Sequence, residues 1–101
     1  MSWQPLFEAT TVALATNATL VAWGSVRVLT LNAYKPSSSV GEGDSIGITI
    51  PEGNRPPKIV YVKLPNYSNN ERIEVQPGGK VQYNGKSTLT NFYAAVVWLV
   101  A

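Results

Sequence analysis

Short apolar stretches separated by turn-forming residues recur along the whole chain. Clusters of Gly, Pro, Asn and Ser interrupt it at short intervals, and the stretches between them are rich in Val, Ile, Thr, Leu and Tyr. No long stretch keeps the 3.6-residue period of an amphipathic helix, whereas short β-branched runs bounded by turn residues are typical of strands. We expect about eight strands, over residues 11–14, 19–23, 25–34, 45–50, 58–64, 72–76, 80–84 and 92–101.

No helical segment is long enough to carry a parallel crossover between these strands. The pattern therefore predicts an all-β fold, either a small antiparallel β-barrel or a sandwich. No internal repeat is visible, so residues 1–101 are predicted to form a single domain. Within the third strand the apolar positions change face between Val28 and Leu29, which predicts a β-bulge over residues 28–30. Residues 72–84 predict a hairpin that turns at Pro77-Gly78-Gly79.

The last ten-residue strand has no charge on either face. Alternation places Phe92, Ala94, Val96, Trp98 and Val100 on one face and Tyr93, Ala95, Val97, Leu99 and Ala101 on the other. One core covers one face of a sheet, so the second face is expected to meet another subunit. Ile59 and Tyr61 repeat the two-sided pattern, and the predicted subunit interface is Tyr93, Val97, Leu99, Ile59 and Tyr61. The alternative is a strand whose second face is covered by Trp3, Phe7 or a long loop.

Composition narrows the range of partners. Charged residues make up only 14% of the chain and the net charge is +2, with the basic residues scattered from Arg27 to Lys86, so nucleic acid is not an expected partner. Cysteine is absent, which excludes disulfides and thiolate metal sites. No apolar run approaches the ~20 residues that span a bilayer, and the first residues lack a signal peptide pattern. We expect synthesis in a cytoplasm and no membrane insertion.

Catalytic chemistry has few candidate residues. Histidine is absent as well as cysteine, which removes the commonest general base and the most reactive nucleophile. Glu42, Asp44 and Glu52 flank one predicted strand and could form a paired-carboxylate hydrolase site or hold Ca²⁺. Acids in such turns are more often solvated loop charges. The chain is therefore predicted to be no enzyme and to need no cofactor or metal.

Aromatic residues next to amides suit a different task. Sugar recognition uses a flat aromatic ring against the C–H face of the sugar and amide or guanidinium groups for its hydroxyls. The candidate ligand-binding residues are Tyr67, Asn66, Asn69, Arg55, Asn54, Tyr83 and Asn84. Tyr and Asn are also common in turns for local reasons, so each of these residues has a structural alternative.

The sequence also resembles a known family. The run from Gly43 to Pro56 (GDSIGITIPEGNRP), followed by Arg72-Ile-Glu-Val75 and Gly79-Lys-Val-Gln-Tyr83, resembles the receptor-binding head domains at the tail tips and baseplates of bacteriophages that infect lactic acid bacteria. Those heads tend to carry an "IPEGYRP" phrase, a hairpin and a closing apolar strand in this order. Asn54 stands where the phrase commonly has an aromatic, and the upstream shaft that trimerises such proteins is missing.

This resemblance implies a function. It implies a compact β-barrel, a homotrimer about a threefold axis and noncatalytic binding of host cell-wall or capsular saccharide. It places the chain in the virion, at the tail or baseplate tip next to other tail proteins, as the C-terminal part of a longer fibre protein. The alternatives are a structural virion module with no ligand, such as a head fibre or baseplate component, and a glycan-cleaving tail enzyme using the three acids.

Overall fold

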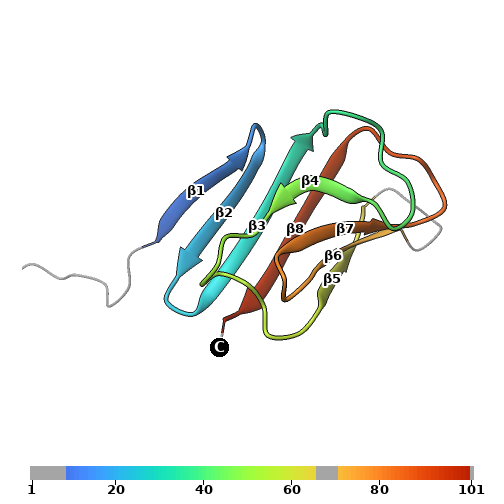
Figure 1. Ribbon diagram of the computed structural model, residues 1–101. Coiled ribbons are helices and arrows are strands. Elements are labelled where there is room, and N and C mark those ends of the chain that lie inside the picture. The colour runs from blue at the N-terminus through green and yellow to red at the C-terminus, as the bar shows by residue number, and fades with distance from the viewer. Residues whose placement is uncertain (1–8, 66–70, 101) are drawn as a thin grey trace, which may run out of the picture.

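The protein is built from eight antiparallel strands. The computed structural model describes residues 9–65 and 71–100, and in these ranges it contains no helix (Figure 1). The strands are β1 (Thr10–Ala15), β2 (Ala18–Trp23), β3 (Val26–Tyr34), β4 (Ser45–Thr49), β5 (Val60–Lys63), β6 (Arg72–Val75), β7 (Lys80–Asn84) and β8 (Phe92–Leu99). The all-β prediction is confirmed, and each predicted strand lies within a few residues of an observed one.

The strands form two four-stranded sheets. The first sheet has the order β1-β2-β3-β8 and the second the order β4-β7-β6-β5. In Figure 1 the strands of the second sheet cross in front of β3 and β8, while β1 and β2 extend beyond them. Among the described residues no ladder joins one sheet to the other, so the fold is a sandwich and the closed-barrel alternative is wrong.

One hydrophobic core fills the space between the sheets. The first sheet supplies Leu20, Leu29, Val96 and Trp98, all almost fully buried. From β4, β6 and β7 of the second sheet come alternate residues: Ile46, Ile48, Ile73, Val75, Val81 and Tyr83. An isolated bridge between Val40 and Leu89 joins two of the connecting loops. The alternation that defines the strands in the sequence is therefore the alternation between core and surface.

The irregularity in β3 lies further along the strand than the sequence indicates. Between Val26 and Asn32 the register with β8 is continuous, so the bulge predicted at residues 28–30 is wrong. The register shifts between Asn32 and Tyr34, where Ala33 has a φ of 58°. A residue in this left-handed conformation rotates the chain, and as a result Tyr34 returns to the core face after Leu31. The two apolar faces at 26–29 arise because Val26 and Val28 lie on the outer face.

The C-terminal strand divides as its alternation predicts. Phe92, Val96 and Trp98 are buried, while Tyr93, Val97 and Leu99 are 48%, 60% and 61% exposed. Trp3 and Phe7, the candidates for covering this second face, lie outside the described residues. The predicted hairpin is also confirmed: β6 and β7 pair from Arg72–Asn84 to Val75–Val81.

The buried hydroxyl of Tyr34 is expected to make the free energy of unfolding decrease at alkaline pH. It donates a hydrogen bond of 2.7 Å to the backbone carbonyl of Ile46, which joins the two sheets. Burial raises the pKa of this hydroxyl above the usual value near 10 because the phenolate would lose its hydration. At a pH above about 10 the unfolded chain releases this proton while the folded chain keeps it, so stability is full below that pH and falls as pH rises.

We expect the free energy of unfolding to fall more steeply between about pH 9 and pH 11 in the native chain than in Tyr34→Phe. Urea denaturation at several pH values measures both slopes. The variant lacks the hydrogen bond, so it should be less stable near neutral pH by about 1 kcal/mol. Parallel slopes in the two proteins would remove Tyr34 as a source of the pH dependence.

Candidate ligand-binding site

The outer face of the second sheet is polar. Alternation turns Tyr61 and Lys63 of β5 outward, together with Arg72 and Glu74 of β6. The register places Tyr61 opposite Glu74 and Lys63 opposite Arg72. Side chains from β5 and β6 thus meet on one surface, because the antiparallel pairing of the two strands aligns them.

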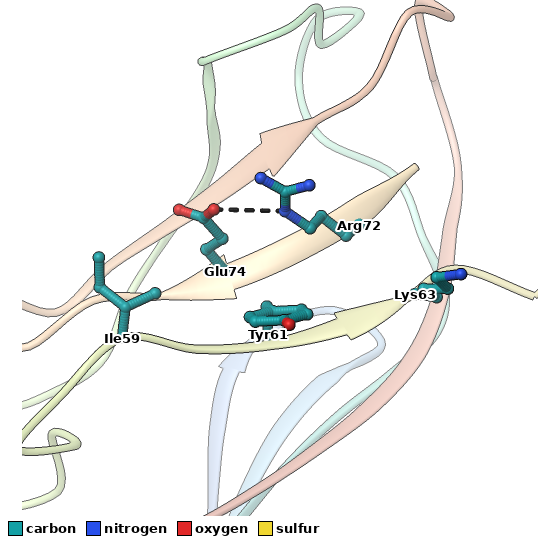
Figure 2. A pocket seen from close by; sticks show the side chains of 5 residues that line it. All are labelled: Ile59, Tyr61, Lys63, Arg72 and Glu74. Carbon is teal, nitrogen blue, oxygen red and sulfur yellow. Dashed lines mark hydrogen bonds and ion pairs between the residues drawn. The ribbon is translucent and has the colours of Figure 1, made fainter. Parts of the chain in front are cut away.

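These side chains line a shallow hollow. It has a volume of about 490 Å³ and is lined by Ile59, Tyr61, Lys63, Arg72 and Glu74. Figure 2 shows the Tyr61 ring lying over β5 with the Arg72 and Glu74 side chains above it and Ile59 and Lys63 at either end. The hollow therefore combines an apolar ring with groups of both charges.

Arg72 is the centre of this arrangement. Its Nε donates to Glu74 Oε1 over 3.4 Å, and its guanidinium carbon lies 5.7 Å from the centroid of the Tyr61 ring. A partly exposed ion pair of this kind adds at most about 1 kcal/mol to stability, so its main effect is to fix the guanidinium beside the ring. The N–H groups of both terminal nitrogens remain as chemical donors, next to a carboxylate acceptor. Tyr61 itself is 65% exposed.

A chain of amides continues the polar surface across β7. Gln76 Nε2 donates to Gln82 Oε1 over 3.1 Å, and Gln82 Nε2 donates to Asn84 Oδ1 over 2.9 Å. Gln82 is also the cross-strand partner of Glu74, and Asn84 that of Arg72. The amides are oriented by one another, which presents fixed donors and acceptors beside the hollow.

Two of the predicted ligand-binding residues hold the fold together. Asn54 Oδ1 accepts 2.7 Å from Arg27 Nε, and its backbone carbonyl accepts 2.8 Å from Trp98 Nε1. Arg55 Nε donates to the carbonyl of Ile50 over 2.8 Å. These bonds attach the connector after β4 to the first sheet and to its own start. The "IPEGNRP" segment therefore stabilises the fold of this chain through these hydrogen bonds.

The other predicted positions divide in three ways. Tyr83 is fully buried and its hydroxyl donates to the carbonyl of Ser87 over 2.8 Å, so its side chain lies in the core and not on the polar face. The reason is that Tyr83 faces inward by the same alternation that turns Asn84 outward, and Asn84 shares the polar face with Arg72. Asn66, Tyr67 and Asn69 lie outside the described residues.

The predicted subunit interface is split between the two sheets. Ile59 and Tyr61 lie on the second sheet and line the hollow. Tyr93, Val97 and Leu99 lie on the outer face of the first sheet. The sequence indicated exposure correctly for all five residues, but it gave no signal for the separation, which follows from the assignment of β5 and β8 to different sheets.

Of the acidic residues considered for catalysis, Asp44 has a local structural role. Asp44 Oδ2 accepts 3.0 Å from the Gly41 N–H, and the Asp44 N–H donates to the Gly41 carbonyl, which closes a turn before β4. A smaller polar hollow of about 280 Å³ lies beside this turn, lined mainly by residues 36–40 and 44–47. In the described part of the chain, no three His, Cys, Asp or Glu side chains gather as metal ligands.

Sequence reasoning missed Arg72, Glu74 and Lys63 as site residues. They were visible only as the polar half of an alternating pattern, and the Tyr61 ring beside Arg72 and Glu74 belongs to another strand.

Comparison with protein-family models and with curated proteins finds no match for this chain. No helix within the described ranges is long and apolar enough to cross a membrane.

Proposed function

We propose that this domain is a noncatalytic adhesion module that binds saccharide in the hollow on the outer face of its second sheet. The observation that carries the proposal is the exposed Tyr61 ring beside an Arg72 guanidinium that Glu74 holds in place. An aromatic ring offers a flat surface to sugar C–H groups. Sugar hydroxyls both donate and accept hydrogen bonds, and the hollow offers donors on Arg72 and Lys63 and an acceptor on Glu74.

The open shape of the site suits binding without catalysis. An open hollow on a sheet leaves most of a bound sugar in contact with water, so a single site gives weak affinity. Several copies on one particle convert such weak contacts into firm adhesion through effective concentration. The resemblance to phage receptor-binding heads supplies this setting: a homotrimer at the tail or baseplate tip of a virion, next to other tail proteins and facing host cell-wall or capsular saccharide.

A structural virion module without a ligand is the second candidate. The observation in its favour is the uncharged outer face of the first sheet, which includes Tyr93, Val97 and Leu99. Such a face suits packing against other proteins. Saccharide binding is preferred because packing alone gives no use to the Tyr61–Arg72–Glu74 arrangement.

Binding to a panel of purified cell-wall polysaccharides from lactic acid bacteria tests the proposal. We expect the native chain to bind at least one of them and Tyr61→Ala to bind it at least about tenfold more weakly, equivalent to ~1.4 kcal/mol. Tyr61→Phe keeps the ring and should retain most of the affinity. Thr49→Ala, an exposed change on β4 of the same sheet, serves as the matched control.

Two results would contradict the proposal. One is equal affinity of the native chain, Tyr61→Ala and Arg72→Ala for the bound polysaccharide, and the other is the absence of binding to every polysaccharide of the panel. The same incubations are assayed for new reducing ends. Their accumulation, and its loss in Glu42→Gln, Asp44→Asn or Glu52→Gln, would favour the glycan-cleaving enzyme instead.

A further inference from the structure

On the described strands of the first sheet, the outer face carries no charged residue. Its cross-strand rows are given by the registers of β1 with β2, β2 with β3 and β3 with β8. The face consists of Thr11, Ala13, Thr19, Val21, Trp23, Val26, Val28, Thr30, Asn32, Tyr93, Ala95, Val97 and Leu99. The one charged side chain within these strands, Arg27, belongs to the opposite face, where it bonds to Asn54.

The centre of this face is apolar, with half-buried valines on β2 and β3 and exposed residues on β8. Val21, Val28 and Val97 follow one another across three strands, and Val97 is 60% exposed. In the next row Val26 pairs with Leu99, which is 61% exposed. Soluble monomers rarely leave a contiguous apolar patch larger than a few hundred Å² open to water. A face of this kind is therefore expected to contact another protein surface.

A copy of the same chain fits this face. Four strands about 4.8 Å apart and six to nine residues long, at about 3.3 Å per residue, cover roughly 400–550 Å² on each partner. Two such faces together bury roughly 800–1,100 Å², which is near the lower limit for a specific interface. Interfaces between identical subunits are the most apolar class and are depleted in charge. A charged partner would find no complementary group here, whereas two uncharged faces need none.

We infer that other copies of this chain cover the outer face of the first sheet, each contributing the same face to the contact. In this contact the second sheet of each copy faces away from the partner, so the hollow beside Tyr61 stays open to solvent in every copy. Ile59 and Tyr61, which the sequence placed with Val97 and Leu99, take no part in it. The inference does not rest on saccharide binding.

Light scattering coupled to size exclusion tests this over a range of concentrations. The native chain is expected at a multiple of the 10.9 kDa chain mass. Val97→Glu places a charge at the centre of the face, on an exposed side chain whose replacement leaves the core intact, and should raise the dissociation constant at least tenfold. Leu99→Lys is a second variant with the opposite charge. Thr49→Glu, an equally exposed change on the second sheet, should leave the mass unchanged.

Circular dichroism and polysaccharide binding by the monomeric variant keep the two proposals separate. A folded Val97→Glu monomer that still binds saccharide at each site supports both. A native chain that stays at 10.9 kDa at every concentration would overturn the inference. So would a Val97→Glu chain that keeps the native mass. If the native monomer also binds an apolar fluorescent dye that Val97→Glu does not bind, the occupant of the face is a different protein.

Discussion

Phe92→Ala is expected to lower the free energy of unfolding by about 3–5 kcal/mol. The ring is 1% exposed and lies between two tyrosines, 6.5 Å from Tyr34 and 5.8 Å edge-on from Tyr83, measured between ring centroids. Tyr34 belongs to the first sheet and Tyr83 to the second, so Phe92 joins the two sheets where β8 begins. Domains of this size are usually stable by 5–15 kcal/mol. The cavity would therefore remove a large share of the total.

Urea denaturation of the native chain, Phe92→Ala and Tyr93→Ala measures the effect. Tyr93 is the next residue on the same strand and turns its side chain to the opposite, exposed face, so its removal should change stability by less than about 1 kcal/mol in the monomer. The comparison is made in the Val97→Glu background to exclude subunit contacts. Similar losses for both variants would mean that the two faces of β8 are not distinguished as described.

Local patterns were sufficient to predict most of the strands. In β6 and β7 the polar and apolar residues alternate strictly. Pro77-Gly78-Gly79 between them consists of residues that favour a tight turn. In β8 the alternation separated Phe92, Val96 and Trp98, which are buried in the core, from Tyr93, Val97 and Leu99 on the opposite face, which was expected to meet another subunit. These features depend on neighbours in the sequence, so the sequence alone contains them.

The pairing between distant segments could not be predicted in this way. β4 pairs with β7 and not with β5, and β3 pairs with β8 across most of the chain length. No residue near β3 indicates that the phase change is resolved at Ala33 instead of at Val28 to Thr30. That choice depends on keeping Tyr34 in line with Ile46 of the other sheet, to which it donates its hydrogen bond.

The candidate site shows the same limit. Tyr61 was assigned to a subunit interface from the two-sided apolar pattern of its strand, because its neighbours on the adjacent strand could not be predicted. Glu74 is its cross-strand neighbour, and Arg72 reaches over its ring from the adjacent strand. The pairing of β5 with β6 places Tyr61 beside this ion pair and away from Val97, which lies on the other sheet.

Gly79→Ala is expected to destabilise the fold by roughly 2–5 kcal/mol, combining backbone strain with overpacking. Gly79 has a φ of +94°, a conformation that L side chains rarely adopt. A Cβ there would lie 2.6 Å from Arg55 Nε and 2.7 Å from the carbonyl oxygen of Ile50. These are the two atoms that bond to each other, and the Gly79 carbonyl accepts from the Ile50 N–H over 2.9 Å. The substitution therefore disturbs the turn and the end of β4 together.

Gly78→Ala is the matched control for this prediction, because a Cβ at that neighbouring position meets no atom within 4 Å and no positive φ opposes it. Replacing this glycine should leave stability unchanged or raise it by up to about 1 kcal/mol, since alanine reduces the freedom of the unfolded chain. Thermal unfolding followed by circular dichroism compares the two variants, and each kcal/mol corresponds to roughly 4–8 °C in a domain of this size. Because the two residues are adjacent, a generally intolerant turn would lower both midpoints. A large fall confined to Gly79→Ala would instead locate the strain at the contact with Ile50 and Arg55, where the connector after β4 is fastened to the second sheet.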